Sequence, residues 1–238
     1  MGKADLHVHT YRSPDALSGI SAILKRARER QLDVVAITDH DTIEGAKEAK
    51  KIAPDFGVDV VIGEEVSTKD GGLIAIFIEE PIKPGSSALE TAKEIHRQGG
   101  LAIVPHPDNW IAEGIYFKTL FKIFESMDGI ELLNGAWFGW LKAKESKKLN
   151  NSTFNLAAVG GSDSHLARQV GCAYTAFEGK TQADLYAAIK AKKTAPWGTY
   201  WSYGDRFLWL LNSPRIFYKW PALPVITARN MFKRIFIK

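Results

Sequence analysis

Two histidines, His7 and His9, stand near the start of the chain in the segment Asp5-Leu6-His7-Val8-His9. Polar and apolar residues alternate in this segment, which is typical of a short β-strand. Side chains two residues apart on a strand project from the same face, so both imidazoles point to one place. Because neutral imidazole is a good ligand for Zn, Mn or Fe, we interpret the pair as part of a metal site rather than as packed or exposed histidines.

Further residues of metal-ligand type follow apolar runs later in the chain. Short runs such as residues 34–37 and 101–104 are expected for strands buried on both faces. Segments with helical patterns separate these runs, which predicts a parallel α/β architecture. In parallel barrels the active groups gather at the carboxyl ends of the strands. The residues at or just beyond such ends are His9, His40, Glu65, His106, Asp163 and His165.

The composition is ordinary for a globular protein, with 45% hydrophobic and 24% charged residues among 238. The net charge of +4 is unevenly divided, because residues 198–238 carry seven basic residues and one acidic residue, which leaves −2 for residues 1–197. The basic character of the whole chain is therefore poor evidence for nucleic-acid binding. The single cysteine, Cys172, excludes an internal disulfide and favours a reducing, cytoplasmic compartment. The first residues lack the apolar stretch of a signal peptide, and no apolar run approaches membrane-spanning length.

Five motifs follow one another in a definite order. They are D-L-H-V-H-T at 5–10, followed by Ser13 and Asp15, then T-D-H-D at 38–41, G-E-E-V-S at 63–67, P-H-P at 105–107 and G-S-D-S-H at 161–165. Together they resemble the PHP (polymerase and histidinol phosphatase) family over about residues 3–195. The resemblance implies an irregular seven-stranded, TIM-like β/α barrel. It also implies a cluster of two or three divalent metal ions that hydrolyse phosphate esters.

The resemblance further implies metal ligands at the matching positions. The implied sets are His7, His9, Glu65 and Asp163 for one ion, Asp15, His40 and His165 for a second, and Glu65 with His106 for a third position. Many family members carry a histidine on the strand after the glutamate, and that position aligns with Gly72 here. Since glycine offers no ligand, we expect two ions rather than three, drawn from Mn, Zn and Fe, with Mg as a further candidate. His106 would then complete another ion's shell or contact the substrate phosphate.

Some of these positions have a second interpretation. Asp15 could instead cap the helix that follows it. Asp39 and Asp41 flank His40 and could orient its ring, or could be caps. Neighbours on a strand face opposite ways, so only one of Glu64 and Glu65 should enter the site, and the register Gly-x-Glu-x-Ser selects Glu65.

Two arginines, Arg12 and Arg168, lie beside the ligand segments. A guanidinium can bind a phosphate through two parallel hydrogen bonds, so either residue could bind the substrate. Both could equally be ordinary surface arginines.

Residues 1–197 are therefore predicted to form a metal-dependent phosphoesterase domain. Its expected substrate is a small phosphorylated metabolite or a nucleotide, attacked by metal-activated hydroxide. One alternative is a 3′–5′ exonuclease, because PHP domains also occur with DNA polymerases. Another is a barrel that only binds metal or a phosphorylated ligand.

Residues 198–238 form a C-terminal extension in which ten aromatic residues are mixed with seven basic ones. Three prolines, Pro214, Pro221 and Pro224, are expected to break any long helix. Residues 228–236 could form a short basic amphipathic helix. The extension could pack on the barrel, lie at a bilayer interface as a peripheral membrane contact, or bind single-stranded nucleic acid.

Overall fold

A computed structural model describes the backbone of residues 1–219 and the side chains of residues 1–212. The short helix expected at 228–236 lies outside the described residues. Within them, nine strands form one sheet in the order β7-β6-β5-β4-β3-β2-β1-β8-β9. The strands are β1 Gly2–Val8, β2 Val34–Ile37, β3 Asp59–Thr68, β4 Gly71–Ile76, β5 Leu101–Val104, β6 Gly129–Asn134, β7 Ala157–Gly161, β8 Ala173–Phe177 and β9 Thr194–Gly198. The α-helices are α1 Ile20–Glu29, α2 Glu44–Ile52, α3 Ala88–Arg97, α4 Phe117–Ile123, α5 Ala143–Leu149, α6 Gln182–Lys190 and α7 Tyr203–Lys219.

The α/β class is confirmed, but the sheet is mixed and has nine described strands rather than the seven expected. Strands β1, β2 and β3 are parallel, and so are β5, β6 and β7. Strand β4 runs antiparallel to both its neighbours, as do β8 and β9 to theirs. A parallel crossover needs about a dozen residues. The link from Thr68 to Gly71 is far shorter, so β4 can only turn back along β3.

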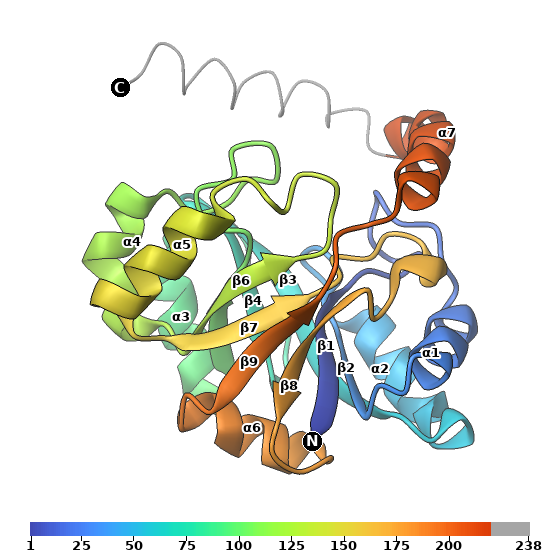
Figure 1. Cartoon of the computed structure of the whole chain (residues 1–238), viewed down its shortest axis with the longest axis horizontal. Coiled ribbons are helices and arrows are strands. Elements are labelled where there is room, and N and C mark those ends of the chain that lie inside the picture. Colours follow the sequence, from blue (N-terminus) through green and yellow to red (C-terminus); the bar gives the residue numbers. More distant parts are fainter. Residues whose placement is uncertain (220–238) are drawn as a thin grey trace.

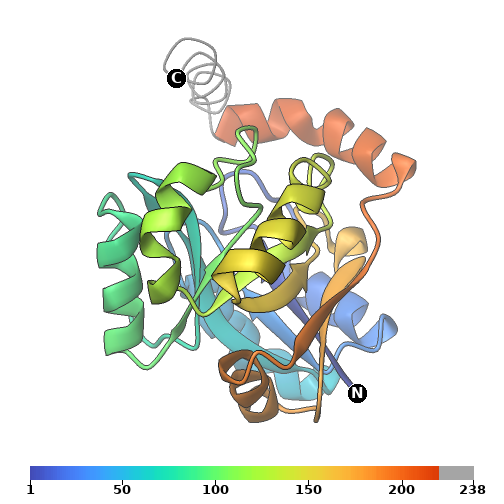
Figure 2. The same ribbon diagram turned by 60° about the vertical axis from the view of Figure 1, so that its left-hand side comes forward.

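The sheet curls into a nearly closed barrel because β7 approaches β1 and β8 (Figure 1). Val8 and Ser164 form a parallel bridge just beyond the strands, where the backbone N–H of His9 donates to the Ser164 carbonyl at 3.0 Å. Strands β7 and β8 are also joined through Thr175 of β8. Its hydroxyl accepts from the N–H of Gly160 and donates to the Gly160 carbonyl, each at 2.9 Å. Helices α1 and α2 cover one side of the barrel, and α3, α4 and α5 cover another (Figures 1 and 2).

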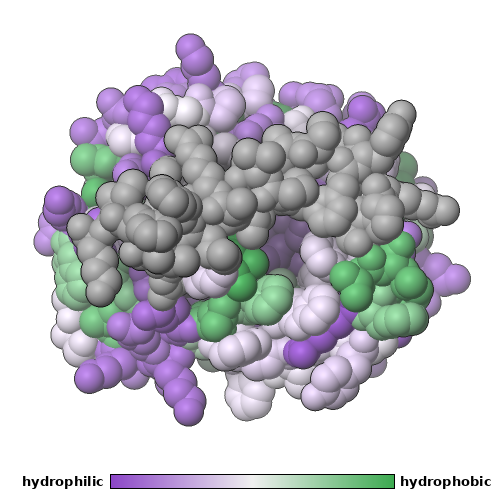
Figure 3. Space-filling model, turned by 90° about the horizontal axis from the view of Figure 1, so that it is seen from above, coloured by the Kyte–Doolittle hydropathy of each residue, from purple (hydrophilic) through white to green (hydrophobic). Residues whose placement is uncertain are grey.

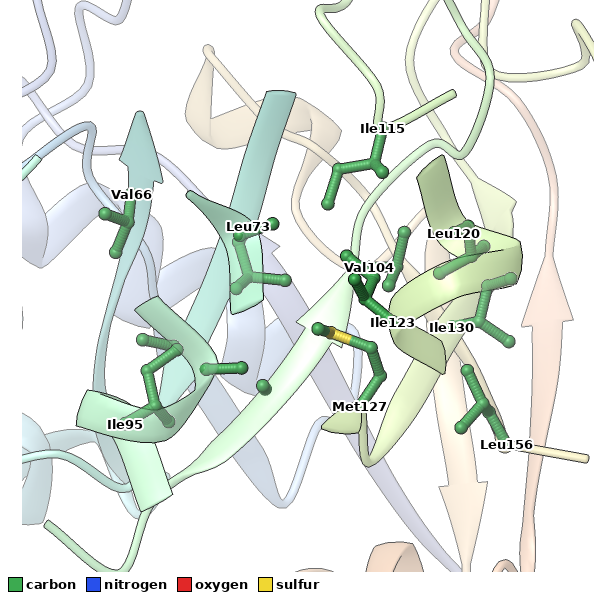
Figure 4. Close-up of a cluster of buried hydrophobic side chains, with 14 of the residues drawn as sticks. Val66, Leu73, Ile95, Val104, Ile115, Leu120, Ile123, Met127, Ile130 and Leu156 are labelled. Atoms are coloured by element: carbon green, nitrogen blue, oxygen red, sulfur yellow. The ribbon is translucent and has the colours of Figure 1, made fainter. Parts of the chain in front are cut away.

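The largest apolar cluster packs α3 and α4 against the strands that carry part of the site (Figure 4). Helix α3 begins with a capping box in which Ser87 and Glu90 satisfy each other's backbone N–H groups. Its buried residues recur at helical spacing and include Ala88, Ala92 and Ile95. The cluster fixes β4, β5 and β6 against their helices, so the ends of these strands are held in a defined place.

Helix α7 lies at the end of the barrel where β1 finishes (Figures 1 and 2). The side chain of Ser202 accepts from the N–H of Asp205 at 3.1 Å and so caps the first turn. The helix continues through Pro214, so the expectation that this proline ends it was wrong. A proline removes one helical hydrogen bond and crowds the preceding turn, which weakens or kinks a helix without always ending it. No helix within residues 1–219 is both long and apolar enough to cross a membrane.

Candidate metal centre

His7 in β1 and His9 just after it face the same point, as their spacing predicted. His7 and His9 are buried, and their ring centroids lie 5.0 Å apart. Nε2 of His7 lies 3.2 Å from Oε2 of Glu65 and 3.5 Å from Oδ1 of Asp163. Nε2 of His9 lies 3.5 Å from the same two oxygens. The four side chains expected to hold the first ion therefore converge from β1, from β3 and from the segment after β7.

The residues expected to hold the second ion meet beside the first group. Oδ2 of Asp15 lies 3.1 Å from Nε2 of His40 and 3.0 Å from Nε2 of His165. Donor atoms of His9, His40 and His165 all lie within 4.8 Å of one another. The interpretation of Asp15 as a helix cap is wrong, because α1 begins only at Ile20 and is preceded by Gly19 without a side-chain cap.

Glu65 lies between the two groups and faces into the barrel end. Its Oε2 is 3.4 Å from Nδ1 of His40, and its Oε1 is 3.2 Å from Nε2 of His106. Glu64 points the other way, where its Oε1 accepts from the N–H of Ile82 at 2.5 Å. Gly72, across from Glu65 on β4, supplies no side chain. A Cβ added at Gly72 would meet Oε1 of Glu65 at 2.6 Å.

A serine and an aspartate fix the tautomer of His9. The Ser13 hydroxyl donates to Oδ1 of Asp39 at 2.9 Å, because an ionised carboxylate can only accept. Nδ1 of His9, 3.1 Å from the same hydroxyl, must then donate to it, which leaves the lone pair of Nε2 directed at the cluster. Asp39 thus orients His9 through Ser13. Asp41 instead bonds the N–H and hydroxyl of Ser67, both at 2.7 Å.

Buried acids and imidazoles strongly shift one another's pKa. Burial would raise the pKa of Asp15, but the charges of His165 and His40 outweigh it and hold that pKa well below its usual range. Burial would lower the pKa of the two histidines, but Asp15 and Glu65 raise the pKa of His40 to about 10, and Asp15 and Asp163 raise that of His165 to about 9. The carboxylates of the cluster therefore favour the protonated form of these two imidazoles. A divalent cation would balance the carboxylates instead and displace the protons.

The donor set fits a metal ion. Three buried polar atoms in the cluster have no hydrogen-bond partner within the described part of the chain, namely Nε2 of His9, Oδ1 of Asp15 and Nδ1 of His106. Buried polar atoms are rarely left unpaired, because each costs free energy. A cation between the facing groups would satisfy the first two. Imidazole nitrogens with carboxylate oxygens suit Mn, Zn or Fe.

Glu131 of β6 is a site residue that the sequence analysis missed. It is 3% exposed, and its Oε1 lies 3.4 Å from Nδ1 of His7. Its Oε2 accepts from the N–H of His106 at 2.9 Å and from Nδ2 of Asn134 at 2.8 Å. Asn134 also donates to Oδ2 of Asp163 at 3.0 Å. A lone carboxylate inside the apolar run 129–133 was the signal that could have identified it.

The two arginines expected to bind substrate both form ion pairs with other residues. Arg12 pairs with Glu48, and Nε of Arg168 lies 2.5 Å from Oδ1 of Asp205. Their side chains are 41% and 53% exposed. The structure therefore brings together the eight expected ligands and leaves both arginines at the surface, where their contact with a phosphate stays a prediction.

Trp201 joins the start of α7 to the metal centre. Its indole N–H donates at 2.9 Å to the carbonyl of Ser162, the residue before Asp163. Its ring lies edge-on to His165, with 6.0 Å between centroids. Figure 3 looks onto this end of the barrel and shows a central hollow with hydrophilic residues inside it and hydrophobic residues at its rim.

The fold and the cluster define an α/β barrel with a histidine- and carboxylate-rich metal centre at one end. Residues 150–194 match the PHP-associated family. The uncharacterized protein MJ1587 of Methanocaldococcus jannaschii is 43% identical over 143 residues, which are 56% of this chain and 81% of that protein. A 5′-3′ exoribonuclease of Haemophilus influenzae is 39% identical over 105 residues, 42% of this chain and 38% of that enzyme. A 3′,5′-nucleoside bisphosphate phosphatase of Chromobacterium violaceum is 33% identical over 101 residues, 42% of this chain and 35% of that enzyme.

The fold also occurs in a solved structure. A two-domain protein of Bacteroides vulgatus, described as containing a predicted PHP-like metal-dependent phosphoesterase, superposes with a TM-score of 0.69. The alignment covers 83% of this chain and 64% of that chain at 20% identity, so the likeness concerns the fold. Together with the ordered motifs and the relatives, it confirms the resemblance. The chain belongs to the PHP family of metal-dependent phosphoesterases.

Proposed function

We propose that this protein hydrolyses phosphate esters with two divalent metal ions held at the end of the barrel. The observation that carries the proposal is the convergence of Glu65 and Asp163 oxygens on the Nε2 atoms of His7 and His9, beside the Asp15 carboxylate between two further imidazoles. The first ion would be held by His7, His9, Glu65 and Asp163, and the second by Asp15, His40 and His165. Glu65 faces both groups, so its carboxylate would be available as a ligand to either ion.

Bound divalent ions supply hydroxide near neutral pH and neutralise charge on phosphoryl oxygens. The protein contributes orientation. Ser13 and Asp39 keep the proton of His9 on Nδ1, and Glu131 faces Nδ1 of His7. The native metal would be Mn, Zn or Fe, with Mg as the harder, oxygen-preferring alternative. Gly72 supplies no ligand, and among the described residues the candidate group at a third position is Glu65, His106 and His7.

The proposed substrate is a small phosphorylated metabolite or a nucleotide. The phosphatase relative of Chromobacterium violaceum supports this class. The exoribonuclease relative keeps a nuclease as the second candidate. Residues 1–197 carry a net charge of −2, which disfavours a long polyanionic substrate along the barrel. We therefore rank the small substrate first.

The experiment is hydrolysis of a generic aryl phosphate by the metal-loaded protein. His9→Ala and Asp163→Ala should each abolish turnover and lower the bound metal, while circular dichroism shows a retained fold. His96→Ala is the matched control, because His96 pairs with Asp128 away from the cluster, and it should keep full activity. A chelator should inactivate the native protein, and a panel of nucleotides and oligonucleotides then separates phosphatase from nuclease. Full activity in either cluster variant would refute the assignment.

A further inference from the structure

Among the described side chains of helix α7, residues 203–212, one apolar face contacts the barrel and a second is exposed. Trp209 packs 6.4 Å from Trp201 and 6.5 Å from Trp137, measured between ring centroids. Residues two apart on a helix point about 200° away from each other. Phe207 and Leu211, each two residues from Trp209, therefore point away from the barrel.

The outward face is a continuous apolar stripe, which we call the outer stripe and define as Tyr203, Phe207 and Leu211. These residues follow one another at intervals of four, so they align along one side of the helix. Their exposed fractions are 86%, 60% and 58%. Large apolar side chains exposed together in a row mark an interaction surface.

The stripe is held in a fixed position on the barrel. The N–H of Trp201 donates to the carbonyl of Gly135 at 2.7 Å, and Nε of Arg206 donates to the carbonyl of Trp201 at 3.0 Å. Asp205 in the first turn pairs with Arg168 at 2.5 Å. These contacts hold the start of α7 against two loops of the barrel, so the outer stripe has a defined position relative to the barrel.

The charge of the sequence after Asp205 indicates the kind of partner that the outer stripe would bind. Asp205 is the last acidic residue of the sequence, and seven basic residues follow it. Aromatic and aliphatic side chains combined with acid-free basic sequence are typical of segments that lie at the surface of anionic membranes. Leucine offers no ring for base stacking, which disfavours single-stranded nucleic acid. Seven like charges would also repel each other in a symmetric dimer through this face.

We propose that the outer stripe and the basic residues after it bind the surface of a membrane that contains anionic lipid. The helix would lie in the interfacial plane with Phe207 and Leu211 toward the acyl chains. Because α7 sits at the metal end of the barrel, the mouth of the metal centre would face the headgroups (Figures 1 and 3).

The test is co-sedimentation of the full-length chain with vesicles. We expect binding to phosphatidylcholine–phosphatidylglycerol vesicles, much weaker binding to phosphatidylcholine alone, and a decrease in high salt. The double variant Phe207→Ser/Leu211→Ser should reduce partitioning by about tenfold or more, because both side chains lose their apolar contact. The pair Lys233→Glu/Arg234→Glu should reduce it by a similar factor. Phe121→Ser is the matched control, since Phe121 is 46% exposed on α4, away from the stripe.

Three results would overturn the proposal. The first is that the full-length chain stays in the supernatant with both lipids. The second is that the stripe variant and Phe121→Ser bind equally well. The third is that the stripe variant converts a dimer to a monomer in light scattering, or loses affinity for an oligonucleotide, with vesicle binding unchanged. Aryl phosphate hydrolysis should be equal in native protein and stripe variant, so failure here would leave the proposed catalytic function standing.

Discussion

Replacing Glu131 by glutamine tests how far a carboxylate behind a ligand controls the metal centre. Glu131 lies 3.4 Å from Nδ1 of His7, and both side chains are almost fully buried. A carboxylate in this position holds the ring and raises the basicity of its other nitrogen. Glutamine keeps the size and an acceptor for the N–H of His106, but it removes the charge.

Loss of such a partner typically weakens metal binding by about 10–100-fold, which corresponds to about 1.4–2.8 kcal/mol. We expect Glu131→Gln to fall in this range, because water cannot screen a pair buried to this extent. Competition of Mn or Zn against a fluorescent chelator measures the change directly. Glu125→Gln, at an exposed position, controls for the loss of one carboxylate. Metal affinity equal to that of the native protein, with the fold intact, would refute the reasoning.

Two further predictions concern β3 and β4. Burial raises the pKa of Glu64 from its usual 4.5 to about 7, so the folded state favours the protonated acid. The raised pKa of Glu64 contributes to the free energy of unfolding below pH 4.5, and this contribution, up to about 3 kcal/mol, is lost as the pH rises through 7. Urea unfolding between pH 5 and pH 8 should show this loss in the native protein and a flatter profile in Glu64→Gln; parallel profiles would contradict it. Gly72→Ala should weaken metal binding because its Cβ would displace the Glu65 carboxylate, whereas Gly19→Ala, with open space around it, should not. Equal affinities in a chelator competition would show that Glu65 moves without cost.

The sequence was sufficient for most elements, because they depend on local patterns, and the family resemblance named the eight candidate ligands that the structure brings together. Strand β5 lies where the apolar run 101–104 predicted it. Strand β9 was not predicted, because it lacks a clear apolar pattern. It is a half-exposed edge strand that contains Pro196 and leaves Trp197 57% exposed. The apolar run around Glu131 could have marked it as a buried carboxylate, but its partner His7 lies 124 residues away, so its role follows only from the structure.

The junction of β1 with the segment after β7 has a consequence for the order of folding. His7 and Asp163 come from opposite ends of the barrel sequence and meet only when Val8 pairs with Ser164. A chain still emerging from the ribosome holds the first histidines long before their acidic partner has been synthesised. Tight capture of the proposed metal ion would therefore be one of the last events of maturation, because a chain that ends before residue 163 lacks the Asp163 carboxylate however well its remaining strands assemble.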